Sequence, residues 1–336
     1  MILSISHPAR EPALTGGFDQ LLRWGVDPAT GQAFWMRQQT CGRLVGHAQT
    51  MEVTLACFQR QAHKAALVQD SEPLPGLLRK AWRRRGEWEQ LRYNWHSGSF
   101  LSSEEALVRG RMFTDQGAAH YTVAMTPLDR SCDLSWPLGS VSQQDADWQG
   151  DAVVAGLPVS GSFQGGQWQF WGRLVSPGLA MVHARHFEGR PEVSFFGMGQ
   201  TLAPRWQSRE PLSLSLGQLR IGEEVIRFDR WWPAPTVDAP RLDNYRWIAT
   251  LANADYRLQV MVDGGNTRLA PWLALNETLP GGGRRVLKIS PYATVRLRLY
   301  RRGSQDVLDE LRSGNCLLMT AIPGNQVSSP GPLSVA

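Results

Sequence analysis

The chain has 336 residues, of which 42% are hydrophobic and 19% are charged, so it has ample material for a core and is not disordered as a whole. Its net charge of +5 and its pI of about 9.3 are modest for this length, and we expect no nucleic-acid partner. The four cysteines are widely spread without a C-x-x-C pair, which argues for reduced thiols and against a metal site. No stretch approaches the ~18 consecutive apolar residues of a membrane-spanning helix, so we expect a cytoplasmic protein.

Short strands are predicted along the first half of the chain. The strand-like runs recur at regular spacing, at residues 18–24, 33–40, 50–59, 106–113, 120–126 and 159–163. Within the third run, alternation places four apolar residues on one side: Met51, Val53, Leu55 and Cys57. Residues 139–156 are polar and rich in turn formers. This rhythm is typical of a β-barrel or a β-sandwich.

One helix is predicted, from Pro75 to Gln90, because its leucines and tryptophans recur at helical spacing. Its polar side carries the basic stretch 79–85. This stretch could make a peripheral contact with an anionic membrane surface, from which an apolar substrate would be drawn. The alternative is a solvated helix over the open end of a barrel, which we favour because a polybasic stretch has low specificity.

The stretch from Trp168 to Phe187 concentrates aromatic and basic residues in two strand-like runs around the turn formers of residues 176–178. Alternation places Trp171 and Arg173 on one face of the first run. On the second run it groups four residues: Met181, His183, Arg185 and Phe187. A mixed aromatic and basic face is typical of the wall of a ligand cavity.

A second series of strand-like runs begins after residue 205, where we predict a domain boundary. The prediction is an all-β chain with two barrel-like domains in tandem, residues 1–205 and 206–325, one short basic helix, and a flexible tail at 326–336 rich in Gly, Ser and Pro.

Three parts of the chain resemble one family in the same order. Residues 27–37 are similar to its early hairpin, Phe170–Arg173 with Val182–Phe187 to its Trp-Gly and histidine-bearing strands, and residues 275–293 to its C-terminal hairpin. This is the lipocalin-like two-domain family of carotenoid 1,2-hydratase, related to tocopherol cyclase and the decalin-forming Diels–Alderases. The resemblance implies two calycin-like barrels and an apolar polyene or isoprenoid substrate, with no cofactor. Phe170 departs from the family, which has His or Asn there, and this puts a hydratase mechanism in doubt.

Candidate catalytic groups follow from the need for a neutral acid beside aromatic walls. His183 matches the family's strand histidine, and Asp229 stands beside two indoles, one of them Trp231. The alternatives are a hydrogen-bonded core histidine and a surface ion pair. Asp255 falls in a predicted turn. Substrate contacts are predicted for six residues: Phe170, Trp171, Arg173, Arg185, Phe187 and Trp231.

Two functions remain open from the sequence. The first is a cofactor-independent cyclase, isomerase or hydratase that acts on an extended apolar polyene or isoprenoid-like molecule in or between the barrels. The second is a non-catalytic carrier of a hydrophobic pigment or lipid. Either way, the expected partner is a hydrophobic small molecule.

Overall fold

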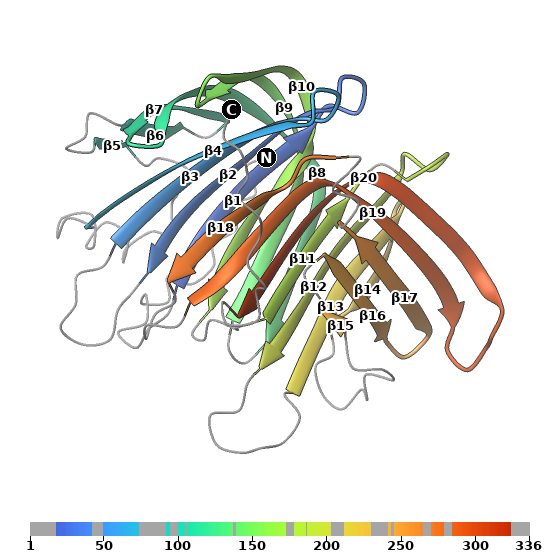
Figure 1. The fold of residues 1–336 in the computed structure, drawn as a ribbon. Helices are drawn as coiled ribbons and strands as arrows, with labels where there is room; N and C mark the ends of the chain where they lie inside the picture. Colours follow the sequence, from blue (N-terminus) through green and yellow to red (C-terminus); the bar gives the residue numbers. More distant parts are fainter. Residues whose placement is uncertain are drawn as a thin grey trace. The chain divides into compact units, whose positions relative to one another are not determined.

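The computed structural model describes residues 18–41, 50–73, 92–94, 100–104, 106–136, 139–172, 178–185, 187–202, 212–229, 241–242, 245–264, 270–278 and 284–323. Within these residues the helices and strands that the structure contains are all β-strands, with no helix among them, and all strand pairs are antiparallel. The strands form two sheets of barrel-like curvature in tandem, which confirms the predicted all-β fold (Figure 1). The predicted helix at 75–90 and the predicted tail at 326–336 lie outside the described residues. No helix that could serve as a membrane span occurs in the described part of the chain.

The first sheet contains the first ten strands in the order β4-β3-β2-β1-β10-β9-β8-β7-β6-β5. Their bounds are β1 Phe18–Val26, β2 Gln32–Cys41, β3 Thr50–Gln59, β4 Lys64–Pro73, β5 Arg92–Asn94, β6 Phe100–Glu104, β7 Leu107–Thr114, β8 Gly117–Trp136, β9 Gly139–Val154 and β10 Leu157–Gly172. The sheet curves until β4 reaches the β7–β8 turn, where the Gln69 backbone N–H donates to Gln116 Oε1 at 3.2 Å.

The polar stretch at 139–156, which the sequence predicted to be rich in turns, is mostly strand β9. It pairs with β8 on one side and β10 on the other, so both neighbours satisfy its backbone hydrogen bonds. Buried Val141, Ala146 and Trp148 anchor it among the polar residues. The local composition was misleading because this strand is stabilised by pairing with β8 and β10, which the composition of the stretch itself does not report.

The second sheet has the order β14-β13-β12-β11-β20-β19-β17-β16-β15, and β18 pairs with β19. The bounds are β11 Gly178–Ala184, β12 Val193–Leu202, β13 Leu212–Ile221, β14 Glu224–Phe228, β15 Arg241–Leu242, β16 Arg246–Ala252, β17 Tyr256–Asp263, β18 Leu273–Thr278, β19 Arg284–Arg301 and β20 Val307–Pro323. Asn253, in the β16–β17 turn, donates from Nδ2 to the backbone oxygen of Arg227 on β14 at 2.9 Å. This bond joins β14, at one end of the sheet, to the β16–β17 turn near the other end.

The change from one sheet to the other lies between Gly172 and Gly178, whereas the sequence placed the domain boundary near residue 205. The two aromatic runs follow each other in the sequence but do not pair with each other. Instead, β10 pairs with β1 and β9, and β11 pairs with β12 and β20. The aromatic stretch is therefore divided between the two units.

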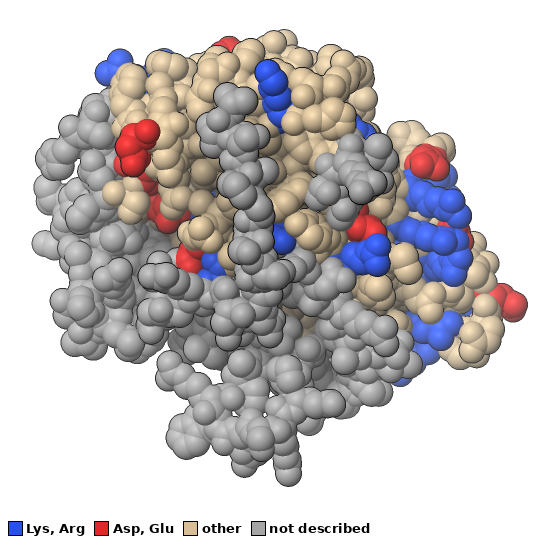
Figure 2. Space-filling model, in the orientation of Figure 1, with Lys and Arg blue, Asp and Glu red and all other residues tan. Residues whose placement is uncertain are grey.

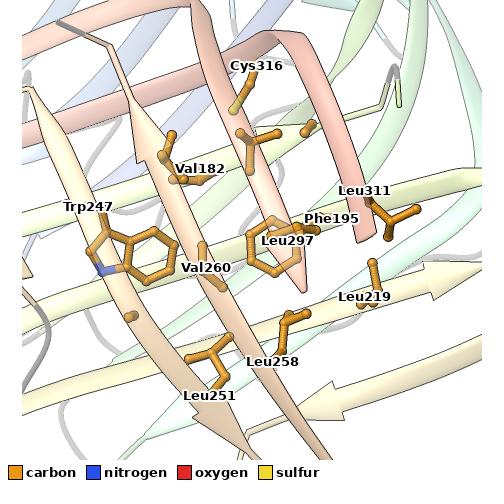
Figure 3. Packing of buried hydrophobic residues seen from close by; sticks show 14 of the residues in the cluster. Val182, Phe195, Leu219, Trp247, Leu251, Leu258, Val260, Leu297, Leu311 and Cys316 are labelled. Carbon is orange, nitrogen blue, oxygen red and sulfur yellow. The ribbon is translucent and has the colours of Figure 1, made fainter. Parts of the chain in front are cut away.

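Each sheet encloses its own apolar cluster. Met51, Val53, Leu55 and Cys57 all lie in the first cluster, as alternation predicted. The second cluster collects side chains from β11 to β14, β16, β17, β19 and β20, which point toward a common centre (Figure 3). Trp247 is fully buried there against the glycines of β12. Since strands from both ends of the sheet contribute, this cluster marks the concave face of the second sheet.

Candidate functional site

A small pocket lies beside β19 in the second sheet, with about 10 Å³ of enclosed space inside a depression of about 200 Å³ that is partly open to solvent. Its lining comes from β19, β20, the residue before β16, the residue after β17 and the residue before β18: Tyr245, Gly264, Trp272, Lys288, Ile289, Ser290, Leu318 and Thr320. Leu318 also belongs to the second apolar cluster, so that cluster forms the floor of the pocket.

Three polar side chains of the pocket share the concave face because of strand register. Lys288 on β19 lies opposite Thr320 on β20, and Ser290 follows Lys288 by two positions. All three are nearly buried, with exposed fractions of 6% for Lys288, 7% for Ser290 and 1% for Thr320. An ammonium group is seldom buried this far without compensation, so its surroundings are informative.

Two aromatic rings compensate for the burial of the Lys288 ammonium group. Lys288 Nζ lies 4.0 Å from the ring centroid of Tyr245 and 5.1 Å from that of Trp272. The two rings meet edge to face, with centroids 5.3 Å apart and an interplanar angle of 82°. Aromatic faces stabilise a cation by about 2 kcal/mol or more where water is excluded. The rings therefore replace part of the stabilisation that the ammonium group loses on burial.

This arrangement combines a cation with three N–H donors, two hydroxyl groups and apolar walls. It is suited to hold a carboxylate, or to polarise the oxygen of a carbonyl group, while the rest of a small molecule contacts the rings. The sequence-based reasoning missed it. The available signal was Lys288 itself, a charged residue inside the otherwise apolar run Val286–Ile289.

His183, the predicted catalytic histidine, is fully buried but does not face the concave side of its sheet. Its neighbours Val182 and Ala184 belong to the second apolar cluster, so His183 points to the opposite face. There it lies opposite Phe196, with ring centroids 6.4 Å apart. His183 therefore does not wall the interior of the barrel.

Phe187 was grouped with His183 by alternation, and this grouping is wrong. Strand β11 ends at Ala184, and Phe187 pairs with Arg190 in an isolated bridge. Phe187 packs in the second apolar cluster, on the concave side. Arg185, which directly follows the strand, is 9% exposed. Side chains alternate between the two faces only within the strand, so the alternation does not extend beyond Ala184 to Phe187.

Asp229, the other predicted acid, is half-buried directly after β14. In the sheet, β12 and β13 separate β14 from β11, so Asp229 and His183 lie three strands apart. At a strand spacing of ~4.8 Å this is about 14 Å. The two residues do not converge on one reacting atom.

The predicted substrate contacts in the first unit are only partly described. Phe170 on β10 is 2% exposed. Trp171 belongs to the same strand, but its side chain lies outside the described residues, as do Arg173 and Trp231. Their roles stay predictions.

A second polar group, also missed from the sequence, lies inside the first sheet. Arg23 is 2% exposed and donates to Gln38 Oε1 at 2.9 Å and to Gln167 Oε1 at 3.0 Å. Burial raises the pKa of the Tyr121 hydroxyl, and the charge of Arg23 opposes that rise. The signal was an arginine within the run Gln20–Val26, which was read only as a strand. Among the described residues, no three His, Cys, Asp or Glu side chains come together as metal ligands would.

Comparison with protein-family models gave no match, and neither did comparison with curated proteins. Among solved structures, the chain is similar to the AttH-like protein of Nitrosomonas europaea, with 12% identity, 92% of each chain covered and a TM-score of 0.52. It is also similar to kievitone hydratase from Nectria haematococca, with 7% identity, 96% of this chain and 95% of that chain covered, and a TM-score of 0.43. The first likeness shows a shared two-barrel fold. At such identities no site residue is carried over.

Proposed function

We propose that this chain binds a small apolar molecule that carries a carboxylate or carbonyl group, at the open end of its second barrel. The observation that supports this function is Lys288, a nearly buried ammonium group with two aromatic rings and two hydroxyl groups around it. Such a lysine gains most from an oxygen ligand with negative charge. The rings and Leu318 supply apolar contact for the remainder of the ligand.

The size of the pocket restricts the ligand. The enclosed space is about 10 Å³, room for a group the size of one water molecule, so the pocket takes only the polar head of a ligand and does not enclose an extended polyene. The carbon chain of such a ligand would lie in the part of the pocket that is open to solvent, beside Tyr245 and Trp272. The ligand class is therefore an isoprenoid or lipid acid, aldehyde or ketone whose polar head enters the pocket.

A cofactor-free isomerase or hydratase acting on the same ligand is the second candidate. A lysine ammonium that donates to a conjugated carbonyl oxygen stabilises the negative charge that develops there when a double bond shifts or takes up water. The described pocket contains this electrophile, Lys288, and two hydroxyl groups, Ser290 and Thr320. A non-catalytic carrier would use the same contacts to bind the ligand but would release it unchanged.

The test compares three probes of matched carbon skeleton: geranic acid, citral and geraniol. We expect the purified chain to bind the acid most tightly, as measured by quenching of tryptophan fluorescence and by calorimetry. Lys288→Met should weaken binding of the acid by about 10- to 150-fold, the equivalent of one lost charge-assisted hydrogen bond, and should leave geraniol within about twofold. Lys64→Met, at an exposed lysine of β4, is the matched control and should change neither.

The same experiment separates the two candidates. Formation of an isomer or a hydrate from citral, lost in Lys288→Met, would identify an enzyme, and recovery of unchanged citral would identify a carrier. Mass spectrometry of organic extracts of the purified protein would name the natural ligand. Equal affinity for acid and alcohol, or an acid affinity indifferent to Lys288, would contradict the proposed function.

A further inference from the structure

The convex face of the second sheet carries an arginine-rich surface on β16, β17, β19 and β20. We call it the arginine face and define it by five arginines and two carboxylates: Arg246, Arg257, Arg296, Arg298, Arg312, Asp263 and Glu310. The arginines point away from the core because Trp247, Leu258, Leu297 and Leu311, their direct neighbours in sequence, belong to the second apolar cluster. Figure 2 shows basic side chains gathered on the part of the surface where Figure 1 places β17, β19 and β20.

The carboxylates do not neutralise this face. Glu310 accepts hydrogen bonds from three guanidinium groups, Arg312 at 2.6 Å, Arg298 at 2.9 Å and Arg296 at 3.0 Å. Asp263 accepts from Arg246 at 2.8 Å. Five positive and two negative charges leave a net charge of +3 on one face of four strands. The side chains of Arg296, Arg298 and Arg312 remain 38%, 38% and 56% exposed, so they are accessible to a further anion.

Apolar side chains are exposed on the same face. Met261 is 50% exposed, Leu308 49% and Ile248 37%, and these three make up half of the six exposed large hydrophobic residues in the described part of the chain. Ile248, Met261, Arg296 and Arg312 lie opposite one another in register across the four strands. A soluble polyanion would need only the charges. A surface of mixed arginine and apolar side chains matches the headgroup region of a bilayer, which offers anions and, just below them, acyl chains.

The arginine face also adjoins the pocket. Arg246 follows Tyr245, and Asp263 precedes Gly264, and both Tyr245 and Gly264 line the pocket. The backbone N–H of Gly264 donates to the oxygen of Tyr245 at 2.7 Å, so the two strands are joined at this point. Docking of the arginine face would therefore bring the pocket rim to the surface from which an apolar ligand partitions.

We infer that the arginine face docks reversibly on an anionic lipid bilayer. The arginines bind lipid headgroups, and Met261, Ile248 and Leu308 enter the boundary between headgroups and acyl chains. The inference rests on charge and exposure, and does not depend on which ligand the pocket takes.

The experiment is co-sedimentation of the full chain with vesicles of phosphatidylcholine alone or mixed with phosphatidylserine. We expect binding to the mixed vesicles, weakening as salt is added because the charges are exposed. The double variant Arg296→Gln/Arg312→Gln should bind about 25-fold more weakly, at about fivefold for each arginine. Met261→Ser should weaken binding by a smaller factor that lower salt does not restore. Arg109→Gln/Arg111→Gln removes two exposed arginines of β7 and should leave binding within about twofold.

Four results would overturn the inference. The first is no binding to the mixed vesicles, and the second is equal binding to both vesicle types. The third is full vesicle binding by the Arg296→Gln/Arg312→Gln variant, together with loss of vesicle binding when the basic residues in 79–85 are substituted. The fourth is retention on immobilised heparin without vesicle binding, which would indicate a soluble polyanion as the partner. Because Lys288→Met leaves the arginine face intact, its vesicle binding should equal that of the wild type even if the proposed ligand is wrong.

Discussion

Two glycines of β12 make the room that Trp247 occupies in the second sheet. A Cβ atom added at Gly199 would lie 2.5 Å from Nε1 and 3.0 Å from Cε2 of Trp247, and one added at Gly197 would lie 2.9 Å from Cη2 of the same ring. Trp247 is fully buried, so its ring has no solvent side to move toward. Gly199→Ala should therefore force a shift of the ring or of the backbone of β12.

The expected cost is about 1–3 kcal/mol in the free energy of unfolding, the usual range for an extra methyl group in a close-packed core. It should appear as a lower midpoint in urea with an unchanged slope. Gly314→Ala on β20 is the matched control, because a Cβ atom there meets no atom within 4 Å. This control should be neutral or slightly stabilising, since alanine restricts the unfolded chain more than glycine does.

A double-mutant cycle tests the physical cause. Trp247→Phe alone should cost about 1–3 kcal/mol because it leaves space in the core. In the double variant Gly199→Ala/Trp247→Phe, the methyl group should fill part of that space, so the two costs should fall short of additive by about 1 kcal/mol or more. Strict additivity, or a Gly199→Ala variant as stable as Gly314→Ala, would refute the reasoning.

Three ion-paired carboxylates that differ in burial lead to the remaining predictions. Glu277 and Arg285 face each other across β18 and β19, with side chains 5% and 4% exposed. Glu277→Gln should therefore lower the free energy of unfolding, measured in urea, by about 3 kcal/mol. Asp263→Asn, in the exposed pair with Arg246, should lower it by less than about 1 kcal/mol. Equal losses of stability in Glu277→Gln and Asp263→Asn would show that burial does not determine how much an ion pair contributes. Hydrogen bonds from Arg312 and two further arginines lower the pKa of Glu310 to about 2. Its stabilising contribution is then present above the ordinary glutamate pKa and is lost as the pH falls toward 2, so the difference in melting temperature between wild type and Glu310→Gln should shrink over that interval. A difference in melting temperature that stays constant over this pH interval would contradict the role of the Glu310 charge.

The fold class could be predicted from the sequence because alternation reports burial locally. Met51, Val53, Leu55 and Cys57 occupy every second position of one run, and all four belong to the first apolar cluster. Strand β9 could not be recognised in this way. Its residues are largely polar, and it is a strand because β8 and β10 satisfy its backbone on both sides.

Pairing partners could not be predicted, because alternation carries no information about which strand lies beside which. The runs at 168–172 and 178–184 are neighbours in the sequence and belong to different sheets. Strand β11 instead pairs with β20, so His183 lies opposite Leu317 near the other end of the chain. The error in the domain boundary has the same cause.

The pocket depends on convergence that no local pattern reveals. Tyr245, Trp272 and Lys288 come from separate segments and meet only because β17 and β18 both pair with β19, and β16, which follows Tyr245, pairs with β17. Phe187 shows the opposite error, since a local period was extended three residues beyond the end of its strand. Residue type identified plausible chemistry, and tertiary structure decided which groups share a site.

The position of β20 within the second sheet has a consequence for how the chain is made. The first sheet has all its strands once synthesis has reached Gly172, so it can fold while the remainder is still being translated. The second sheet cannot, because β20 lies between β11 and β19 and is the last strand to be synthesised. Until residues 307–323 emerge, β11 to β14 and β15 to β19 are two separate fragments with unpaired edges. A premature stop before Val307 would therefore leave the N-terminal barrel complete and the C-terminal strands prone to aggregation.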